Sequence, residues 1–353
     1  MNYAVNIVAT ILLFPWPAIV IMSPMMIAAR GFSNDKSSII ITILFFIYPA
    51  LIFLLIKLFG FKFYGTEPLA WGVGFSIAAV IIIQLYGLPR MLSNLYSNIP
   101  NEGYHITTDK VYKNGIPLKE ADPQTFTSLE GTHFYSKDAY RVYADFTIIK
   151  NADAPSFGAV EGSNGIYWKD KNSAYSQWER IKDSDGETFE WIGHNYAKDK
   201  NHVYFDQYIV DNADPNSFKA LESYIGRDNH AVFVRHYEAN NIRDLDSFEL
   251  IHFDEKFFGK DNHHVYAIFY NSSNPLEIFP GADPATFKPV GEYYAVDDKH
   301  VYHYSYHRGH VKVLSGVNPD NFVLEHDPAT GANARAGDLL FRNGDVVSPE
   351  DEP

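Results

Sequence analysis

A short phrase recurs along this chain of 353 residues, and it constrains the fold more than any other feature. The phrase is an Asp-led turn followed by a hydrophobic residue and then an aromatic one, as in residues 138–143, 199–204 and 261–266. Successive copies lie 29 to 39 residues apart. Periods of about 20–50 residues are typical of solenoids, propellers and arrays, in which each unit buries its apolar face against the next. We therefore predict a tandem repeat array.

Two sets of aromatic residues keep the same phase in these repeats and form the predicted core. The first set ends the Asp-led phrase and comprises Tyr112, Tyr143, Tyr175, Tyr204, Phe233, Tyr266, Tyr302 and Phe341. The second set belongs to a phrase typified by residues 213–218 and comprises Phe126, Phe157, Phe189, Phe218, Phe248, Phe287 and Phe322. Because both sets share one period, we expect their rings to slot between successive units.

Each repeat unit is predicted to be a β-hairpin followed by a short connecting helix. Residues 196–204 place Asp and Asn between two β-prone segments, which favours a tight turn. In the second phrase Asp214 has the character of an N-cap and Pro215 that of a first helical residue. A four-stranded propeller blade needs about 40–45 residues, so we favour a solenoid-like stack of hairpins, with a closed propeller-like ring as the alternative. Residues 109–115 and 338–344 resemble each other and are the expected caps.

Three apolar stretches precede the repeats, at 3–29, 39–59 and 68–89. Each has about the 20 residues that a helix needs to cross a hydrocarbon core, so we predict three membrane spans. Pro15, Pro17 and Pro24 predict a kinked or broken first span. The expected organisation is a membrane region at 1–92, a linker at 93–104, a repeat domain at 105–347 and an acidic tail at 348–353.

Charge separates the two parts of the chain. Residues 1–92 carry a net charge of +3, so the total of −14 leaves −17 for the rest. An acidic surface repels nucleic acid, which excludes that partner class. No ionisable group lies in the middle of a span, which favours anchoring over transport. Basic residues do not fix the orientation, because Lys57 and Lys62 oppose Arg30, Lys36 and Arg90.

The repeats resemble the bacterial DKNYY family, which takes its name from an Asp-Lys-Asn-Tyr-Tyr core. The resemblance rests on residues 196–204 and 213–218 and covers most of 105–345, with Asp170-Lys171-Asn172 and Asp199-Lys200-Asn201 as the closest copies. It implies an uncharacterised, often extracytoplasmic family with no activity to carry over. The expected location is therefore a bacterial cytoplasmic membrane, with the array on the outer side.

Three groups of residues are candidates for chemistry. Equivalent turns hold His202, His230, His263 or His264, and His300, which we interpret as exposed turn residues and not as metal ligands. Residues 183–187 are oxygen-rich, but they occupy the cap position of their repeat. Residues 302–310 alternate aromatics with His at strand spacing, so one exposed face could bind a partner. That possible partner surface comprises Tyr302, His303, Tyr304, Tyr306, His307 and His310.

The function predicted from these observations is binding. We expect a membrane-anchored, non-enzymatic repeat protein at the bacterial cell envelope, with the lipid bilayer and a protein or envelope component as partners. Abundant Tyr favours binding, because its ring gives large contact area at low entropic cost. The alternative is an envelope hydrolase or metal-binding protein that uses residues 303–310. No catalytic, cofactor or metal residue is assigned, and the sequence identifies neither the ligand nor the oligomeric state.

Overall fold

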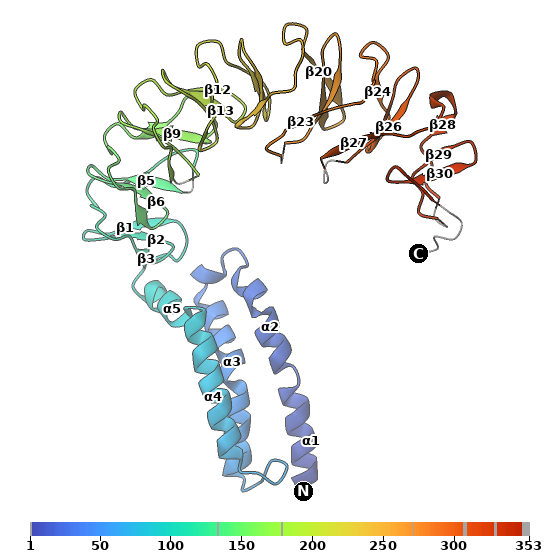
Figure 1. Cartoon of the computed structure of the whole chain (residues 1–353). Coiled ribbons are helices and arrows are strands. Elements are labelled where there is room, and N and C mark those ends of the chain that lie inside the picture. The colour runs from blue at the N-terminus through green and yellow to red at the C-terminus, as the bar shows by residue number, and fades with distance from the viewer. Residues whose placement is uncertain are drawn as a thin grey trace. The chain divides into compact units, whose positions relative to one another are not determined.

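The computed structural model describes residues 2–132, 134–177, 179–270, 272–305, 309–327 and 330–347. The chain forms two compact units, of which the first comprises Met1–Glu130 with Tyr135–Ile148, and the second Gly131–Phe134 with Ile149–Pro353. Helices occupy the start of the first unit, and small β-sheets follow in both units (Figure 1).

The first unit begins with five α-helices, and three helical stretches are long and apolar enough to cross a membrane: Tyr3–Ile27, Lys36–Leu58 and Pro68–Leu85. The first stretch is broken after Leu13, as its prolines predict, because Pro15 cannot continue the hydrogen-bond ladder. The fifth helix runs through residue 92, so the expected domain boundary lies inside a helix. The helices are α1 (Asn2–Leu13), α2 (Trp16–Ile27), the 3-10 helix η1 (Phe32–Asn34), α3 (Lys36–Leu58), α4 (Pro68–Leu85) and α5 (Leu88–Tyr96).

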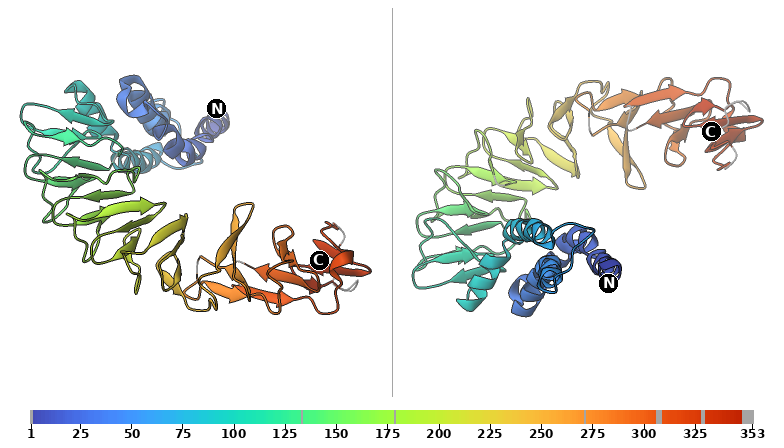
Figure 2. Two further views of the ribbon diagram at one scale, coloured as in Figure 1. Left: turned by 90° about the horizontal axis from the view of Figure 1, so that it is seen from above. Right: turned by 90° about the horizontal axis from the view of Figure 1, so that it is seen from below.

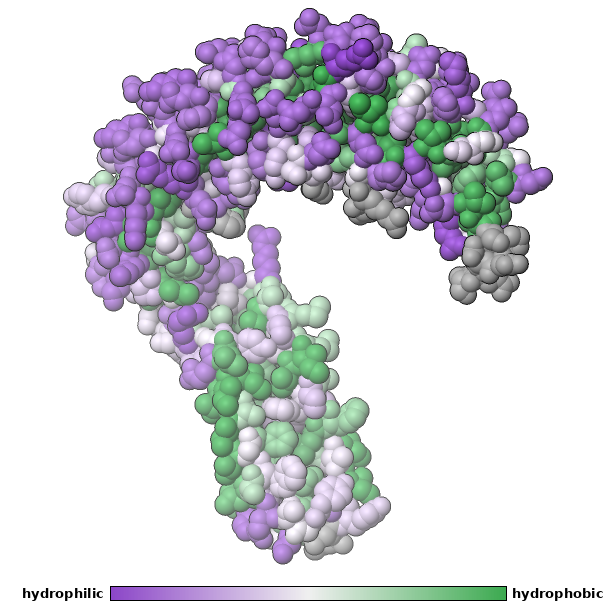
Figure 3. Space-filling view, viewed as in Figure 1, coloured by the Kyte–Doolittle hydropathy of each residue, from purple (hydrophilic) through white to green (hydrophobic). Residues whose placement is uncertain are grey.

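Aromatic side chains hold α3 and α4 together. The Phe53 ring stacks on Trp71 and Phe75 with centroids 6.1 and 5.6 Å away, and it meets Phe63 edge-on at 5.1 Å. Gly72 allows this approach, since a Cβ there would lie 3.4 Å from the Phe53 Cβ. Apolar residues cover most of the helical surface in Figure 3, whereas the sheets present mainly hydrophilic residues.

Eight separate antiparallel sheets make up the repeats, and none closes into a barrel. Each is a meander in chain order, with three strands in the first sheet and four in every other. The first unit contains β1 (Tyr104–Ile106), β2 (Val111–Lys113) and β3 (Ile116–Pro117), then β4 (Thr127–Ser128), β5 (Tyr135–Lys137), β6 (Val142–Ala144) and β7 (Thr147–Ile148).

The second unit contains the other six sheets. They are β8 (Gly158–Ala159), β9 (Tyr167–Lys169), β10 (Ala174–Ser176) and β11 (Glu179–Arg180); β12 (Glu190–Gly193), β13 (Tyr196–Lys198), β14 (Val203–Phe205) and β15 (Tyr208–Ile209); β16 (Lys219–Glu222), β17 (Ile225–Arg227), β18 (Val232–Val234) and β19 (Tyr237–Ala239); β20 (Glu249–Phe253), β21 (Lys256–Lys260), β22 (Val265–Ile268) and β23 (Leu276–Ile278); β24 (Lys288–Pro289), β25 (Tyr294–Val296), β26 (Val301–Ser305) and β27 (His310–Val313); and β28 (Phe322–Val323), β29 (Ala334–Ala336), β30 (Leu339–Arg342) and β31 (Asp345–Val346). Figure 2 shows these sheets from two further directions.

The prediction of short connecting helices is wrong. The second phrase makes one helical turn, in which the Phe218 N–H donates to the Asp214 carbonyl at 3.0 Å, and β16 begins at the next residue. The last repeat has a single 3-10 turn, η2 (Pro319–Asn321). A single turn is little stabilised by helix propagation, whereas the residues that follow it form backbone hydrogen bonds with a neighbouring strand. The prediction of one two-stranded hairpin per repeat is also wrong. The strands are only two to five residues long, so a repeat of about 30 residues holds four of them.

The core lies between successive sheets, where the predicted rings meet. Phe218 packs against Tyr196 of the preceding sheet and Phe233 of its own, with centroids 5.1 and 5.7 Å away. Small residues on the second strand make room, since a Cβ at Gly226 would lie 2.3 Å from the Phe218 ring. Of the fifteen predicted core rings, thirteen are buried, and Tyr112 and Phe322 are half-buried. The buried rings are Phe126, Phe157, Phe189, Phe218, Phe248, Phe287, Tyr143, Tyr175, Tyr204, Phe233, Tyr266, Tyr302 and Phe341.

Candidate functional site

The Asp that opens the hairpin turn in each internal repeat is a buried structural carboxylate. In the phrase at 199–204, Asp199 Oδ1 accepts from the backbone N–H groups of Asn201 and His202 at 2.7 and 2.8 Å. Its Oδ2 accepts from the Asp185 N–H and the Tyr204 hydroxyl, both at 2.7 Å. One side chain therefore closes the hairpin turn, fixes the turn of the second phrase and binds a core tyrosine.

Six repeats use this arrangement, and we call it the Asp bolt. Its members share the two turn N–H donors and the N–H of the Asp in the second phrase, and all but one also bind the tyrosine five residues on. The bolts are Asp138, Asp170, Asp199, Asp228, Asp261 and Asp297. Asp228 has Phe233 at that fifth position and lacks the hydroxyl.

Hydrogen bonds lower the pKa of two bolts, Asp261 and Asp297, despite their burial. Burial alone would raise the pKa of Asp261, but hydrogen bonds from the Tyr266 hydroxyl and from backbone N–H groups lower it to about 2. For Asp297 burial is likewise outweighed by such bonds, and the pKa is about 2. Burial and the neighbouring carboxylate raise the pKa of Tyr266 and of Tyr302. Each bolt accepts at least three hydrogen bonds from its own repeat, so these carboxylates hold the repeat together.

The two end repeats replace the bolt. Thr107 and Ala336 occupy the positions five residues before Tyr112 and Phe341. The Thr107 hydroxyl accepts from the Lys110 N–H at 3.0 Å, so it closes the turn without a charge. The expected caps therefore differ from the internal repeats at the position of the Asp bolt.

Of the possible partner surface, four residues are described, and three of these are inside the protein. Tyr302, His303 and Tyr304 are buried, since β26 is an inner strand of its sheet and neighbouring sheets cover both of its faces. The alternation predicted one exposed face, and this expectation is corrected. The His310 side chain is 58% exposed and lies 3.5 Å from Glu277 Oε1. Tyr306 and His307 lie outside the described residues.

The turn histidines belong to different sheets and do not converge. His300 Nδ1 lies 3.2 Å from its own Tyr302 hydroxyl, and His202 Nδ1 lies 3.4 Å from Tyr204. Among the described residues, no group of three or more His, Asp or Glu side chains is placed to hold a metal ion. In residues 183–187, Asp185 accepts from the Thr188 N–H at 3.0 Å and pairs with Lys200, which is a capping role.

A polar collar joins the first sheet to the helices within the first unit. The buried Asn101 side chain donates to the carbonyls of Ser33 and Met91 at 2.7 and 2.9 Å and accepts from Asn94 at 2.8 Å. Its backbone N–H donates to Asn34 Oδ1 at 2.7 Å. Asn94 also donates to the Gly115 carbonyl at 2.8 Å, in the turn between β2 and β3. Asn101 therefore ties η1, α5 and the first sheet together.

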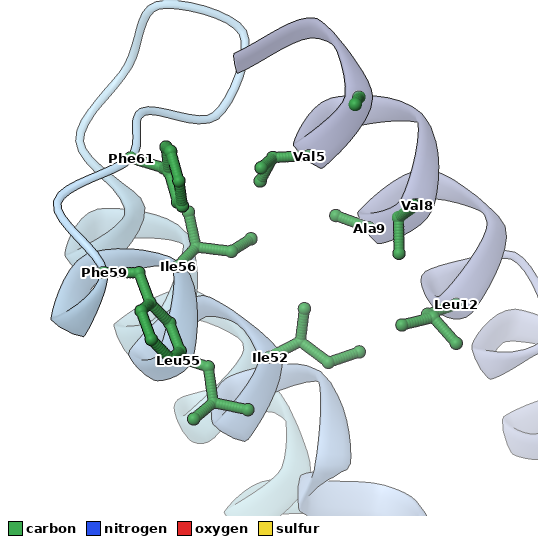
Figure 4. Close-up of a pocket in the computed structure, with 10 residues that line it drawn as sticks. Val5, Val8, Ala9, Leu12, Ile52, Leu55, Ile56, Phe59 and Phe61 are labelled. Atoms are coloured by element: carbon green, nitrogen blue, oxygen red, sulfur yellow. The ribbon is translucent and has the colours of Figure 1, made fainter. Parts of the chain in front are cut away.

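Two pockets differ in chemistry. An apolar groove of about 360 Å³ lies between α1 and α3, where Val5, Val8 and Leu12 face Ile52 and neighbouring aliphatic side chains (Figure 4). In the second unit a polar and aromatic pocket of about 300 Å³ is formed by two consecutive sheets, β12–β15 and β16–β19, and the connection that follows β22. It is lined by Asn195, Phe205, Asp206, Ser223, Tyr224, Arg235 and Tyr270. We call it the Arg235 pocket.

Sequence reasoning missed the Arg235 pocket, although a signal for it was present. Two-residue connections join the last two strands of six sheets, and each begins with a residue at positive φ. Asn, Asp or Gln stands at that position in five of them, and Arg235, at φ +56°, in the sixth. Asn and Asp tolerate the left-handed region, whereas a long side chain there is uncommon.

Comparison with known proteins gives one match. The model of the DKNYY family matches residues 104–236, 135–267 and 167–306, which together span more than half of the chain. The three overlapping matches follow the period of the repeats. Neither the curated proteins nor the solved structures contain a match.

Proposed function

The chain belongs to the DKNYY family, and we propose that it is a membrane-anchored, non-enzymatic binding protein of the bacterial cell envelope. The observation that carries the proposal is the Asp bolt. The Asp that recurs in six of the eight repeats accepts hydrogen bonds from its own repeat in the core, so it supports a scaffold. Residues that differ between repeats are then available for binding on the surface.

Three helices support the anchoring part of this proposal. Each is long and apolar enough to span a bilayer, and the first unit continues without a break from these helices into the first sheet through the Asn101 collar. In this proposal the collar holds the base of the array at the membrane surface. Three spans place the loop at 59–67 and the array on opposite sides, and we propose that the array is extracytoplasmic.

Cysteine labelling tests the topology cleanly, because the chain has no cysteine of its own. Lys62→Cys and Asn229→Cys each introduce one thiol at an exposed position. In spheroplasts treated with a membrane-impermeant maleimide, we expect Asn229→Cys to react at once and Lys62→Cys to react only after lysis. Both proteins should remain in the membrane fraction after extraction at high pH.

Each other outcome has a distinct meaning. Reaction of both thiols in intact spheroplasts would refute three spans, and the reverse pattern would refute the orientation. Release of the protein at high pH would refute the anchor. Crosslinking in the same spheroplasts, followed by mass spectrometry, would then test binding, which the proposal requires to involve the array and not the helices.

A further inference from the structure

The Arg235 pocket lies where the repeat pattern changes. Phe233 replaces the tyrosine of the Asp bolt in this repeat. The hydroxyl that reaches the next sheet is also lost, because Ile225 stands where Tyr196 stands one repeat earlier. Finally, the connection between β22 and β23 lengthens to 269–275 and brings Tyr270 to the pocket. The first two departures lie in the sheet that carries Arg235, and the third brings a residue of the next repeat to the pocket.

Backbone strain at Arg235 is a further departure in this repeat. Its φ of +56° is one that Asn or Asp adopts more readily, and strained residues persist where the surrounding structure holds them, often at binding sites. The Arg235 N–H donates to the Tyr224 carbonyl at 2.7 Å. The Tyr196 hydroxyl lies 3.0 Å from the carbonyl oxygens of both residues. The two pocket residues are therefore fixed to each other and to the preceding sheet.

The side chains of the pocket leave hydrogen-bonding groups available. The Arg235 guanidinium packs 5.5 Å from the Phe205 ring and makes no hydrogen bond or ion pair with any described residue. One Asp206 oxygen accepts from Asn195 Nδ2 at 2.9 Å, which leaves the other without a partner among those residues. The Ser223 hydroxyl is likewise unpaired within the described chain and exposed.

Aromatic rings supply the rest of the lining. Tyr224 and Tyr270 lie with centroids 4.9 Å apart, and Phe257 supports Tyr224 edge-on at 5.7 Å. Tyr270 is 40% exposed, so part of its side chain is accessible to a ligand. Burial, with the nearby Tyr270 and Glu222, raises the pKa of Tyr224 to about 12, so its hydroxyl is a neutral donor at physiological pH.

We propose that the Arg235 pocket binds a neutral saccharide of the cell envelope. A pyranose ring has an apolar C–H face that can pack on Tyr270, and an edge of hydroxyls that planar Arg, Asp and Asn side chains can bind in pairs. The proposal deepens the binding function proposed above and rests on it. The volume of about 300 Å³ is at the lower end of small-molecule sites and fits one or two sugar rings.

Other ligand classes fit the same residues less well. An anion would meet Asp206 and the field of a chain with net charge −14. A cation would meet the unpaired Arg235 guanidinium. An apolar ligand would bury that charge and the Asp206 carboxylate without partners, which is expensive. A neutral ligand with both hydroxyls and an apolar face satisfies all of these groups.

The test uses the full-length protein in detergent and a glycan array that carries neutral and acidic oligosaccharides. We expect wild type to retain at least one neutral glycan, and titration calorimetry with that glycan gives its affinity. Arg235→Asn should weaken this affinity about 10- to 100-fold, since a charge-assisted hydrogen bond is lost. Because Asn suits the left-handed turn, the same variant should melt no lower than wild type. This combination separates a lost contact from a lost fold.

Two further variants complete the design. Tyr270→Ala should also weaken binding, whereas Tyr140→Ala, which removes a 73% exposed ring in the first unit, should not. The inference is overturned if wild type retains no neutral glycan, if only acidic glycans bind, or if Arg235→Asn binds as tightly as wild type. Any of these results leaves the maleimide pattern unchanged, so the anchor and the topology are judged separately. If a protein is crosslinked to the array but no neutral glycan binds, the proposed binding function stands and the saccharide site is refuted.

Discussion

The tyrosine hydroxyl that binds the Asp bolt can be tested with a matched pair of substitutions, because one repeat has Phe233 in place of this tyrosine. Tyr204→Phe removes only the oxygen that lies 2.7 Å from Asp199 Oδ2, and leaves a buried carboxylate with three donors. Hydrogen bonds to charged groups stabilise by about 1.5–3 kcal/mol. Phe233→Tyr makes the opposite change and places a hydroxyl within reach of Asp228, which has the same three backbone donors.

Hydrogen exchange is the appropriate assay, because the units of a repeat array can open separately and a global melt would mix their stabilities. We expect the peptide covering 199–205 to exchange about 10- to 150-fold faster in Tyr204→Phe, which is the same 1.5–3 kcal/mol expressed as an opening equilibrium. The peptide covering 228–234 should exchange more slowly in Phe233→Tyr. Peptides more than one repeat away should be unchanged in both variants. Exchange at 199–205 within twofold of wild type would refute the argument that the hydroxyl stabilises the bolt.

Three further predictions follow from the same geometry. Gly115→Ala should loosen the Asn101 collar and speed proteolysis between the helices and the first sheet, because its Cβ would lie 2.5 Å from the Asn101 and Asn94 side chains. Gly103→Ala, with a similar φ and open space, is the control, and equal cleavage of both would contradict the steric argument. Since the folded pKa of Asp261 and Asp297 is about 2, below the usual value near 3.9, their stabilisation is complete above about pH 5 and is lost as the pH falls toward 2, by about 2 kcal/mol each. An acid titration followed by near-UV circular dichroism should therefore show a flat signal from pH 7 to 5, and a loss already at pH 6 would contradict this. Phe218→Ala should destabilise its region by about 3–5 kcal/mol and lower the melting temperature, and an unchanged melt would mean that this ring adds nothing to the core.

The repeat, its phase and its aromatic core were predictable from the sequence, because burial between identical units forces the same ring type to recur at one period. The three apolar helices and the break near Pro15 were predictable for a different reason, because segment length, hydropathy and proline geometry are local properties of the sequence. The connecting helices were not. Asp214 and Pro215 do start a helical turn, but the local pattern carries no information about the strand pairing that ends it at Phe218.

The surface residues were harder to predict than the core. Tyr302 and His303 alternate as on a half-exposed strand, yet β26 is covered on both faces. Whether a strand is inner or outer depends on its sheet neighbours, which a single sequence does not show. Arg235 could have been found, since it breaks the Asn, Asp or Gln pattern at a turn position. That comparison requires knowing that the turns are equivalent, and the divergent 269–275 connection hides the equivalence.

The Asp bolt explains how one repeat can depart from the others without loss of the fold. Each bolt joins groups of a single repeat, so the stability of the array is close to a sum of local contributions and neighbour interfaces. A repeat that gives up the hydroxyl at Phe233 and adds strain at Arg235 loses a few kcal/mol locally, by the magnitudes for such bonds and strain. The sheets on either side keep their own bolts, Asp199 and Asp261. Local bolts therefore allow binding residues to be placed in one repeat while the neighbours hold it in position.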